Sequence, residues 1–214
     1  MTLHELSRLA SLGEGRSLEF KHKVPRPERI AKEIIAFANT HGGQLLLGVD
    51  DNGAILGVRD ANEEEFALDE ALKMHCEPPV AIRIEKIAVT NNREVLVVQV
   101  PESEAKPHYL ILENSRCAYV RVDDMSVEAS REKVRLMKSE HTHANVKFEF
   151  GDKELMLMRY LEQYGRITVT QFAKMAHLPR RRASQTLVLL ARARIVILHS
   201  TGNEDYFTLA YQKL

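Results

Sequence analysis

Apolar residues recur at two different spacings along the first part of the chain, which predicts a mixture of strands and helices. At positions 17–21 they alternate with polar residues, as in a half-buried strand. At 26–38 they recur every three or four residues, as in an amphipathic helix. The same reasoning predicts strands at 44–49, 54–58, 80–89, 95–100 and 117–122, and helices at 63–74 and 126–138. We therefore expect residues 1–140 to form an α/β (α+β) domain with a mixed sheet.

The pattern changes after residue 151. Three amphipathic segments predict helices at 153–164, 170–177 and 180–193. Two short apolar segments then flank Ser200-Thr201-Gly202-Asn203, which is typical of a hairpin with a glycine turn. Three helices followed by a two-stranded hairpin is the order of a winged helix. We therefore expect a small winged-helix-like domain at 152–214, joined to the first domain by a linker at 141–151.

Glycines mark two turns of the first domain. Gly42 and Gly43 follow the helix at 26–38, and Asp51-Asn52-Gly53 is a strong hairpin signal before the strand at 54–58. The stretch up to Gly48 lacks the spacing of a phosphate-binding loop, so an ATPase is the weaker alternative. We favour a structural role, with Gly42 and Gly43 ending the helix and Gly48 allowing close packing in a strand.

The composition is that of an ordinary soluble globular protein, with 44% hydrophobic and 28% charged residues among 214. Two cysteines suit a reducing compartment better than a disulfide framework. We find no secretory signal and no apolar segment long enough to span a membrane. The expected location is the cytoplasm, with no membrane partner.

Charge is distributed unevenly, although the formal net charge is zero. Residues 152–214 contain ten Lys and Arg against five Asp and Glu, whereas residues 1–151 contain twenty against twenty-five. A basic segment attracts phosphates even when the whole chain is neutral. The tail is therefore the part expected to meet nucleic acid.

Arginines gather on the third helix of the tail, the one that a winged helix places in the major groove. This group could contact phosphates and guanine, and a glutamine one turn further on could pair with adenine. The candidate nucleic-acid-binding residues of the tail are Arg180, Arg181, Arg182, Gln185, Arg192 and Arg194. The alternative is a solvated basic face on a module that contacts other proteins.

Four ordered stretches together resemble the Schlafen AlbA_2 domain family. They are EGRSLEFK at 14–21, AFANTHGGQLLLGVDD at 36–51, VPESEAKP at 100–107 and YVRV at 119–122. The resemblance implies a mixed α/β domain in proteins that act on nucleic acids, as DNA-binding regulators or, in some Schlafen proteins, as RNA-cleaving enzymes. A glycine tends to follow the last stretch in the family, whereas this chain has Asp123-Asp124. These aspartates place two negative charges at an edge that could otherwise approach a phosphate backbone.

The resemblance also implies a candidate catalytic site. The glutamates and the aspartate of the cleaving members fall on Glu14, Glu19 and Asp51, with Asp50 the alternative if the register shifts by one. Three carboxylates could hold Mg²⁺ or Mn²⁺, and Lys21, on the same strand face as Glu19, could contact a phosphate. The alternative is that Glu19 and Lys21 form a solvated strand face and the aspartates begin a turn.

Our leading hypothesis is a homodimeric transcriptional regulator that binds nucleic acid, DNA rather than RNA, and needs no cofactor to do so. The first alternative is a nuclease that uses Mg²⁺ or Mn²⁺ at the three carboxylates. The second is a scaffold whose two domains bind other proteins.

Overall fold

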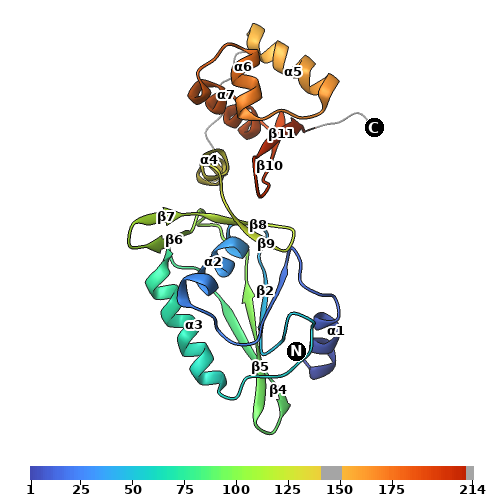
Figure 1. The fold of residues 1–214 in the computed structure, drawn as a ribbon, viewed down its shortest axis with the longest axis vertical. Coiled ribbons are helices and arrows are strands. Elements are labelled where there is room, and N and C mark those ends of the chain that lie inside the picture. The colour runs from blue at the N-terminus through green and yellow to red at the C-terminus, as the bar shows by residue number, and fades with distance from the viewer. Residues whose placement is uncertain (141–150, 211–214) are drawn as a thin grey trace. The chain divides into compact units, whose positions relative to one another are not determined.

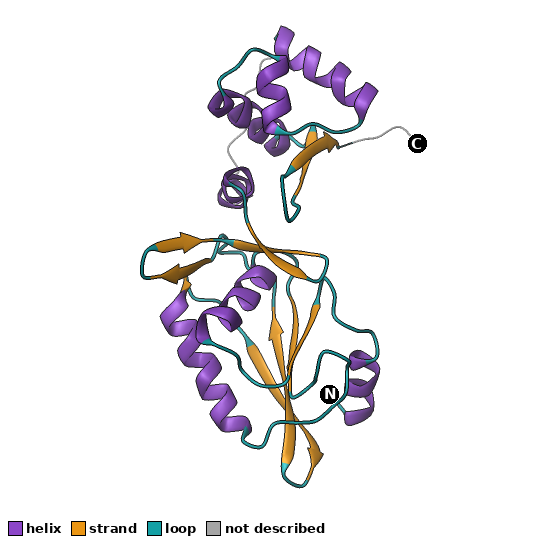
Figure 2. Ribbon diagram, viewed as in Figure 1, coloured by secondary structure: helices purple, strands orange, loops and turns teal. Residues whose placement is uncertain are grey.

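The computed structural model describes residues 1–140 and 151–210 (Figures 1 and 2). Tertiary contacts divide the chain into two units, Met1–Glu128 and Ala129–Leu214. Helix α4 (Arg131–Glu140) therefore falls in the second unit, whereas the sequence analysis placed it in the first. The linker expected at 141–151 lies, except for Gly151, outside the described residues.

The first unit is built on a four-stranded mixed sheet, in the order β1-β2-β5-β4. Strand β1 pairs with β2 in parallel, and the other two pairings are antiparallel. The bounds are β1 Leu18–Lys21, β2 Gly43–Leu47, β4 Arg83–Thr90 and β5 Arg93–Val100. The mixed α+β architecture expected from the sequence is confirmed.

Helices cover both faces of this sheet (Figure 1). Helices α2 (Pro27–Ala38) and α3 (Ala61–His75) pack on the face that presents Leu45 and Val98. Helix α1 (Leu3–Ala10), which the sequence analysis did not predict, packs on the opposite face with Leu46 and Val97. The side chains of each strand alternate between these two cores, as pleating requires.

Two further small sheets complete the first unit. One has the order β3-β6-β7, and the other is the hairpin β8-β9. Their bounds are β3 Cys76–Glu77, β6 Tyr109–Leu112, β7 Ser115–Cys117, β8 Tyr119–Val122 and β9 Met125–Glu128. The helix predicted at 126–138 was wrong at its start, because its first residues belong to β9.

The strand predicted at 54–58 does not form a ladder. Asp50 and Gly53 do make the turn, with the Gly53 N–H donating to the Asp50 carbonyl at 2.9 Å. The N–H groups of Leu56 and Gly57 then both donate to the Gly48 carbonyl, at 2.9 and 2.8 Å, so this backbone bulges instead of pairing residue by residue. Only isolated bridges formed by Ile55 and Val58 remain in this part of the described chain.

The glycines after α2 have the structural role expected of them. Gly42 has φ +72°, and its N–H donates to the carbonyl of Phe37 at 2.9 Å, which ends the helix. A Cβ on Gly43 would lie 2.4 Å from the Phe37 ring. Gly48, at φ +100°, similarly lies against the backbone of Gly57. The loop thus brings the start of β2 close to α2.

The second unit contains α4 and the elements of the tail. The three helices and the hairpin predicted for the tail are confirmed. An isolated bridge pairs Ile167 with Phe207 and so adds a third extended segment beside the hairpin. The core gathers Leu157, Phe172 and Leu187 around Phe207. The bounds are α5 Asp152–Tyr164, α6 Val169–Met175, α7 Arg180–Arg192, β10 Val196–His199 and β11 Tyr206–Leu209. No helix within residues 1–140 and 151–210 has the length and apolar content needed to cross a membrane.

Candidate carboxylate site and nucleic-acid interface

The structure brings Glu14 and Glu19 together around one lysine. The Lys21 ammonium donates to a carboxylate oxygen of Glu19 and to the carbonyl of Phe20, the latter at 2.7 Å, and lies 3.8 Å from Glu14 Oε1. That Glu14 oxygen also accepts the N–H of Phe20 at 2.8 Å. Lys21, which we expected to be available to a phosphate, is therefore paired with Glu19 and lies beside Glu14.

A buried arginine completes this cluster from the other side. The Arg121 guanidinium has no exposed side-chain surface, and it lies 3.0 Å from Glu19 Oε2 and 3.0 Å from Glu33 Oε2. It also donates to the carbonyl of Gly15 at 2.7 Å and lies over the Phe37 ring, 4.7 Å from its centroid. The sequence analysis missed both Arg121 and Glu33. The alternation of the 119–122 strand would place an arginine between two valines on a solvated face, so the sequence pattern carried no signal of its burial.

Burial also changes the chemistry of Glu19, which is only 7% exposed. Desolvation raises the pKa of its carboxyl above the ordinary value, although the hydrogen bond from Lys21 and the nearby charge of Arg121 act in the opposite direction. Glu19 is thus not part of a solvated strand face, which corrects the alternative considered above. It lies on the side of the sheet covered by α2.

Asp51 is not part of this cluster of contacts. Its side chain is exposed, and the adjacent Asp50 carboxylate accepts the N–H groups of Asn52 and Ala54, at 3.0 and 2.8 Å. This is the turn-forming role that aspartate commonly has. Within the described residues, no group of three or more His, Cys, Asp or Glu side chains is arranged to hold a metal ion. The site as it lies does not fit Mg²⁺ or Mn²⁺, because Lys21 and Arg121 already occupy the oxygens of Glu19.

The aspartates that replace the family glycine have a backbone explanation. Asp123 and Asp124 are exposed in the turn between β8 and β9, and Asp123 has φ +53°. That left-handed conformation favours glycine, and aspartate is one of the few other residues that tolerate it. The turn is kept while two negative charges are added to it.

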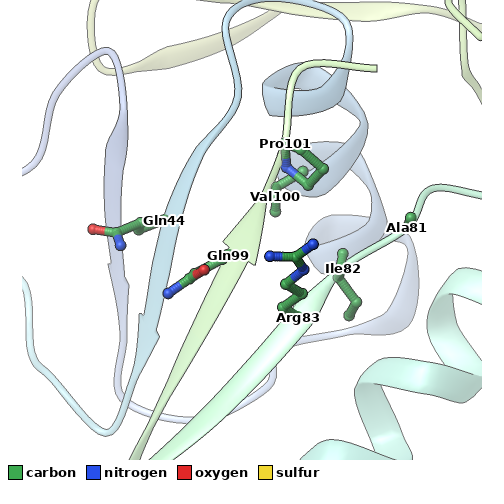
Figure 3. A pocket seen from close by; sticks show the side chains of 7 residues that line it. All are labelled: Gln44, Ala81, Ile82, Arg83, Gln99, Val100 and Pro101. Atoms are coloured by element: carbon green, nitrogen blue, oxygen red, sulfur yellow. The ribbon is translucent and has the colours of Figure 1, made fainter. Parts of the chain in front are cut away.

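A cavity of about 440 Å³ lies at one end of the main sheet (Figure 3). Gln44, Gln99 and Arg83 come from three neighbouring strands and form a row across the sheet, as the strand register requires. The rest of the lining is apolar and comes from Ala81, Ile82, Val100 and Pro101. Arg83 is the charged residue in this lining, and the sequence analysis did not single it out.

In the second unit, three consecutive arginines begin α7. Arg180, Arg181 and Arg182 are all exposed, and the N-cap is Pro179, whose side chain caps nothing. The first N–H groups of a helix lack partners within it and carry a partial positive charge. The start of α7 therefore combines three guanidinium groups with the positive end of the helix dipole.

The other candidate residues extend this positive region along α7. Arg182, Gln185 and Arg192 follow one another at spacings of three and seven residues, which places them on one helix face. Gln185 is exposed and Arg192 is half-buried. Arg194 lies beyond the helix at φ +57°, exposed in the turn before β10. The opposite side of α7 is buried through Ala183, Leu187 and Leu190.

The sequence match covers most of the first unit. The family described as Schlafen, AlbA_2 matches residues 14–130, which is more than half of the chain. This chain belongs to the Schlafen AlbA_2 family. The AlbA_2 match extends from before β1 to just after β9, so it includes Glu14, Glu19 and the buried Arg121. The arginines of α7 lie outside it.

Two solved structures resemble this AlbA_2 chain at low identity. The N-terminal domain of an ATP-dependent DNA helicase RecG-related protein from Nitrosomonas europaea is 20% identical, with a TM-score of 0.43, over 61% of this chain and 93% of that chain. The DIP2311 protein from Corynebacterium diphtheriae is 16% identical, with a TM-score of 0.45, over 78% of this chain and 34% of that chain.

Proposed function

We propose that this protein binds nucleic acid, with DNA preferred over RNA, and acts as a homodimeric transcriptional regulator. The binding surface would be the arginine face of α7, formed by Arg180, Arg181, Arg182, Gln185 and Arg192. The observation that carries the proposal is the exposure of Arg180, Arg181 and Arg182 together at the start of a helix whose other side is packed in a core. No carboxylate forms an ion pair with these arginines among the residues described. Their charge is therefore available to a phosphate.

The chemistry of the face suits a duplex. Arginine forms two parallel hydrogen bonds with a phosphate or with the edge of guanine, and glutamine can do the same with adenine. Arg182, Gln185 and Arg192 lie on one side of α7 and span nearly three helical turns. That length suits the major groove, where an α-helix fits.

The arrangement of the second unit supports DNA as the partner. Its order of three helices and a hairpin is that of a winged helix, in which the third helix enters the major groove. The major groove of B-form DNA is wide enough for this helix, whereas that of A-form RNA is deep and narrow. Membership of the Schlafen AlbA_2 family favours a nucleic-acid-associated function as well. Symmetric dimers are common among such DNA-binding modules, which motivates the homodimer.

Fluorescence anisotropy with labelled duplex DNA and duplex RNA of one sequence, in EDTA and over a series of salt concentrations, tests the proposal. We expect salt-dependent binding with DNA the tighter ligand. Arg182→Gln should weaken DNA binding and, for a phosphate contact, reduce the slope of log K against log salt by about 0.9. The matched control is Arg159→Gln, on an exposed position of α5 in the same unit.

Equal weakening by Arg182→Gln and Arg159→Gln would place the interface elsewhere. Wild-type protein that binds no nucleic acid at low salt would favour the protein-interaction alternative instead. Loss of full-length nucleic acid only when Mn²⁺ replaces EDTA would favour the nuclease. Light scattering after size-exclusion chromatography tests the homodimer, and a monomeric mass with DNA bound would overturn that part.

A further inference from the structure

Helix α4 packs along α7 through a small polar cluster. Arg135 donates from Nη1 to the hydroxyl of Ser184 at 2.9 Å, and that hydroxyl donates to the carboxylate of Glu132. Ser184 is only 3% exposed. These bonds fix the position of α4 beside the first turns of α7. Both helices belong to the second unit.

A cavity of about 790 Å³ lies where these two helices begin. Ligand sites typically have volumes of roughly 300–1,000 Å³, so the space is sufficient for a nucleotide-sized molecule. The lining consists of Ser130, Arg131, Glu132, Arg135, Arg180, Arg181 and Ser184. None of the α4 arginines was singled out by the sequence analysis, because their helix had been assigned to the other domain.

The charge of this lining is strongly positive. Four arginines face one glutamate, and the glutamate already accepts the hydroxyl of Ser184. Across the described part of the chain, Arg131, Arg180 and Arg181 form no ion pair with a carboxylate. Like charges held around one space repel each other unless an anion lies between them. The lining therefore has a net excess of three positive charges over its one carboxylate, Glu132, which suits an anion.

Two helix N-termini contribute to the same space. Arg131 is the first residue of α4 and Arg180 is the first residue of α7. Ser130 accepts the N–H of Lys133 at 3.1 Å, and α7 has no side-chain cap at all. Each helix start carries a partial positive charge, and the two act together with the four guanidinium groups.

We propose that this cavity is a phosphate-binding site that takes the phosphate groups of a polyphosphate. The guanidinium fork of arginine matches phosphate oxygens, and several forks around one space suit a chain of phosphates better than a single one. The phosphate can belong to a free polyphosphate or nucleotide, or to a nucleic-acid strand. In the second case the inference rests on the proposed function.

Calorimetric titration of the full chain with inorganic tripolyphosphate tests this site. We expect one-to-one binding in the wild type. Arg131→Gln should weaken it by at least about tenfold, because a charge-assisted hydrogen bond is lost. Arg131 is chosen because it lies outside the α7 face proposed for DNA. Arg159→Gln is the control and should bind as the wild type does, and circular dichroism should show both variants folded.

A parallel anisotropy titration with duplex DNA distinguishes the sources of phosphate. Weaker tripolyphosphate binding in Arg131→Gln with unchanged DNA affinity assigns the cavity to a free ligand. Weaker DNA binding with no uptake of tripolyphosphate assigns it to a strand. Unchanged binding of both overturns the site. Wild-type protein that binds tripolyphosphate through Arg131 but binds no DNA would uphold this inference and reject the proposed function.

Discussion

Replacing Arg121 with methionine should destabilise the first unit more than any change at an exposed arginine. The guanidinium is completely buried and holds Glu19 and Glu33 from opposite sides, each at 3.0 Å. Methionine fills much of the same volume but cannot pair with either carboxylate. Arg121→Met thus leaves the buried Glu19 and the half-buried Glu33 without this cation, next to the Phe37 ring on which the guanidinium lay.

The size of the effect follows from the burial of the partners. Removing one member of a buried ion pair costs about 3–5 kcal/mol, because the remaining charge has lost its partner without regaining water. Glu19 keeps Lys21, and Glu33 keeps Lys32, whose ammonium lies 3.3 Å from Glu33 Oε1. These remaining cations place the expected loss near the lower limit, at about 3 kcal/mol.

Hydrogen exchange measured by mass spectrometry reports this loss for one unit at a time. Peptides from α2 and β5 should exchange about a hundredfold faster in Arg121→Met, since 1.4 kcal/mol corresponds to a factor of ten. Arg116→Met is the control. Arg116 is exposed, lies 3.8 Å from Glu77 and covers the Tyr109 ring, so its loss should cost at most about 1 kcal/mol.

A second variant separates charge from packing. Adding Glu19→Gln and Glu33→Gln to Arg121→Met removes the stranded charges and should restore part of the lost stability. If Arg121→Met changes the exchange of these peptides no more than Arg116→Met does, the buried cluster does not stabilise the fold.

Three further predictions concern the pKa of His108, the packing around Gly43 and the role of Asp51. Burial lowers the pKa of His108 below its ordinary value of 6.5, so the folded state binds fewer protons than the unfolded state as the pH falls. The contribution of His108 to stability is therefore complete above about pH 6.5 and should be lost below it. The melting temperature should be lower at pH 5.5 than at pH 7.5, and this decline should be smaller in His108→Gln. Gly43→Ala should cost about 1–3 kcal/mol in urea unfolding, because its Cβ meets the Phe37 ring, whereas Gly15→Ala has open space and should cost far less; equal costs would contradict the packing argument. Asp51→Asn should leave DNA affinity within about twofold of the wild type, and a larger loss by anisotropy would assign this exposed side chain to the interface.

Most helices and strands could be predicted because their apolar residues follow a regular period. The helix at 26–38 and the strands at 80–89 and 95–100 have such patterns, and the structure contains α2, β4 and β5 there. Turn signals in the sequence predicted the structure of the segments that follow them less reliably. The hairpin signal at 51–53 did form a turn, but the positive φ of Gly48 and Gly57 turned the next segment away from a ladder. Sequence periodicity carries no information on such backbone contacts.

The candidate sites were only partly visible in the sequence, because contacts between distant segments decide them. The arginines of α7 could be named from their succession and from the helix period. Arg121 could not be linked to Glu33, which is 88 residues away and meets it only after α2 and β8 come together. Arg131 and Arg135 escaped notice for the same reason, since their helix packs on α7 and not on the sheet.

Hydrogen exchange of the full chain with and without duplex DNA locates the DNA contact on the protein. Binding through α7 should slow exchange in peptides that cover residues 180–194, with the first unit unchanged apart from any shared dimer contact. Protection confined to residues 1–128, with α7 peptides unaffected at saturating DNA, would contradict it.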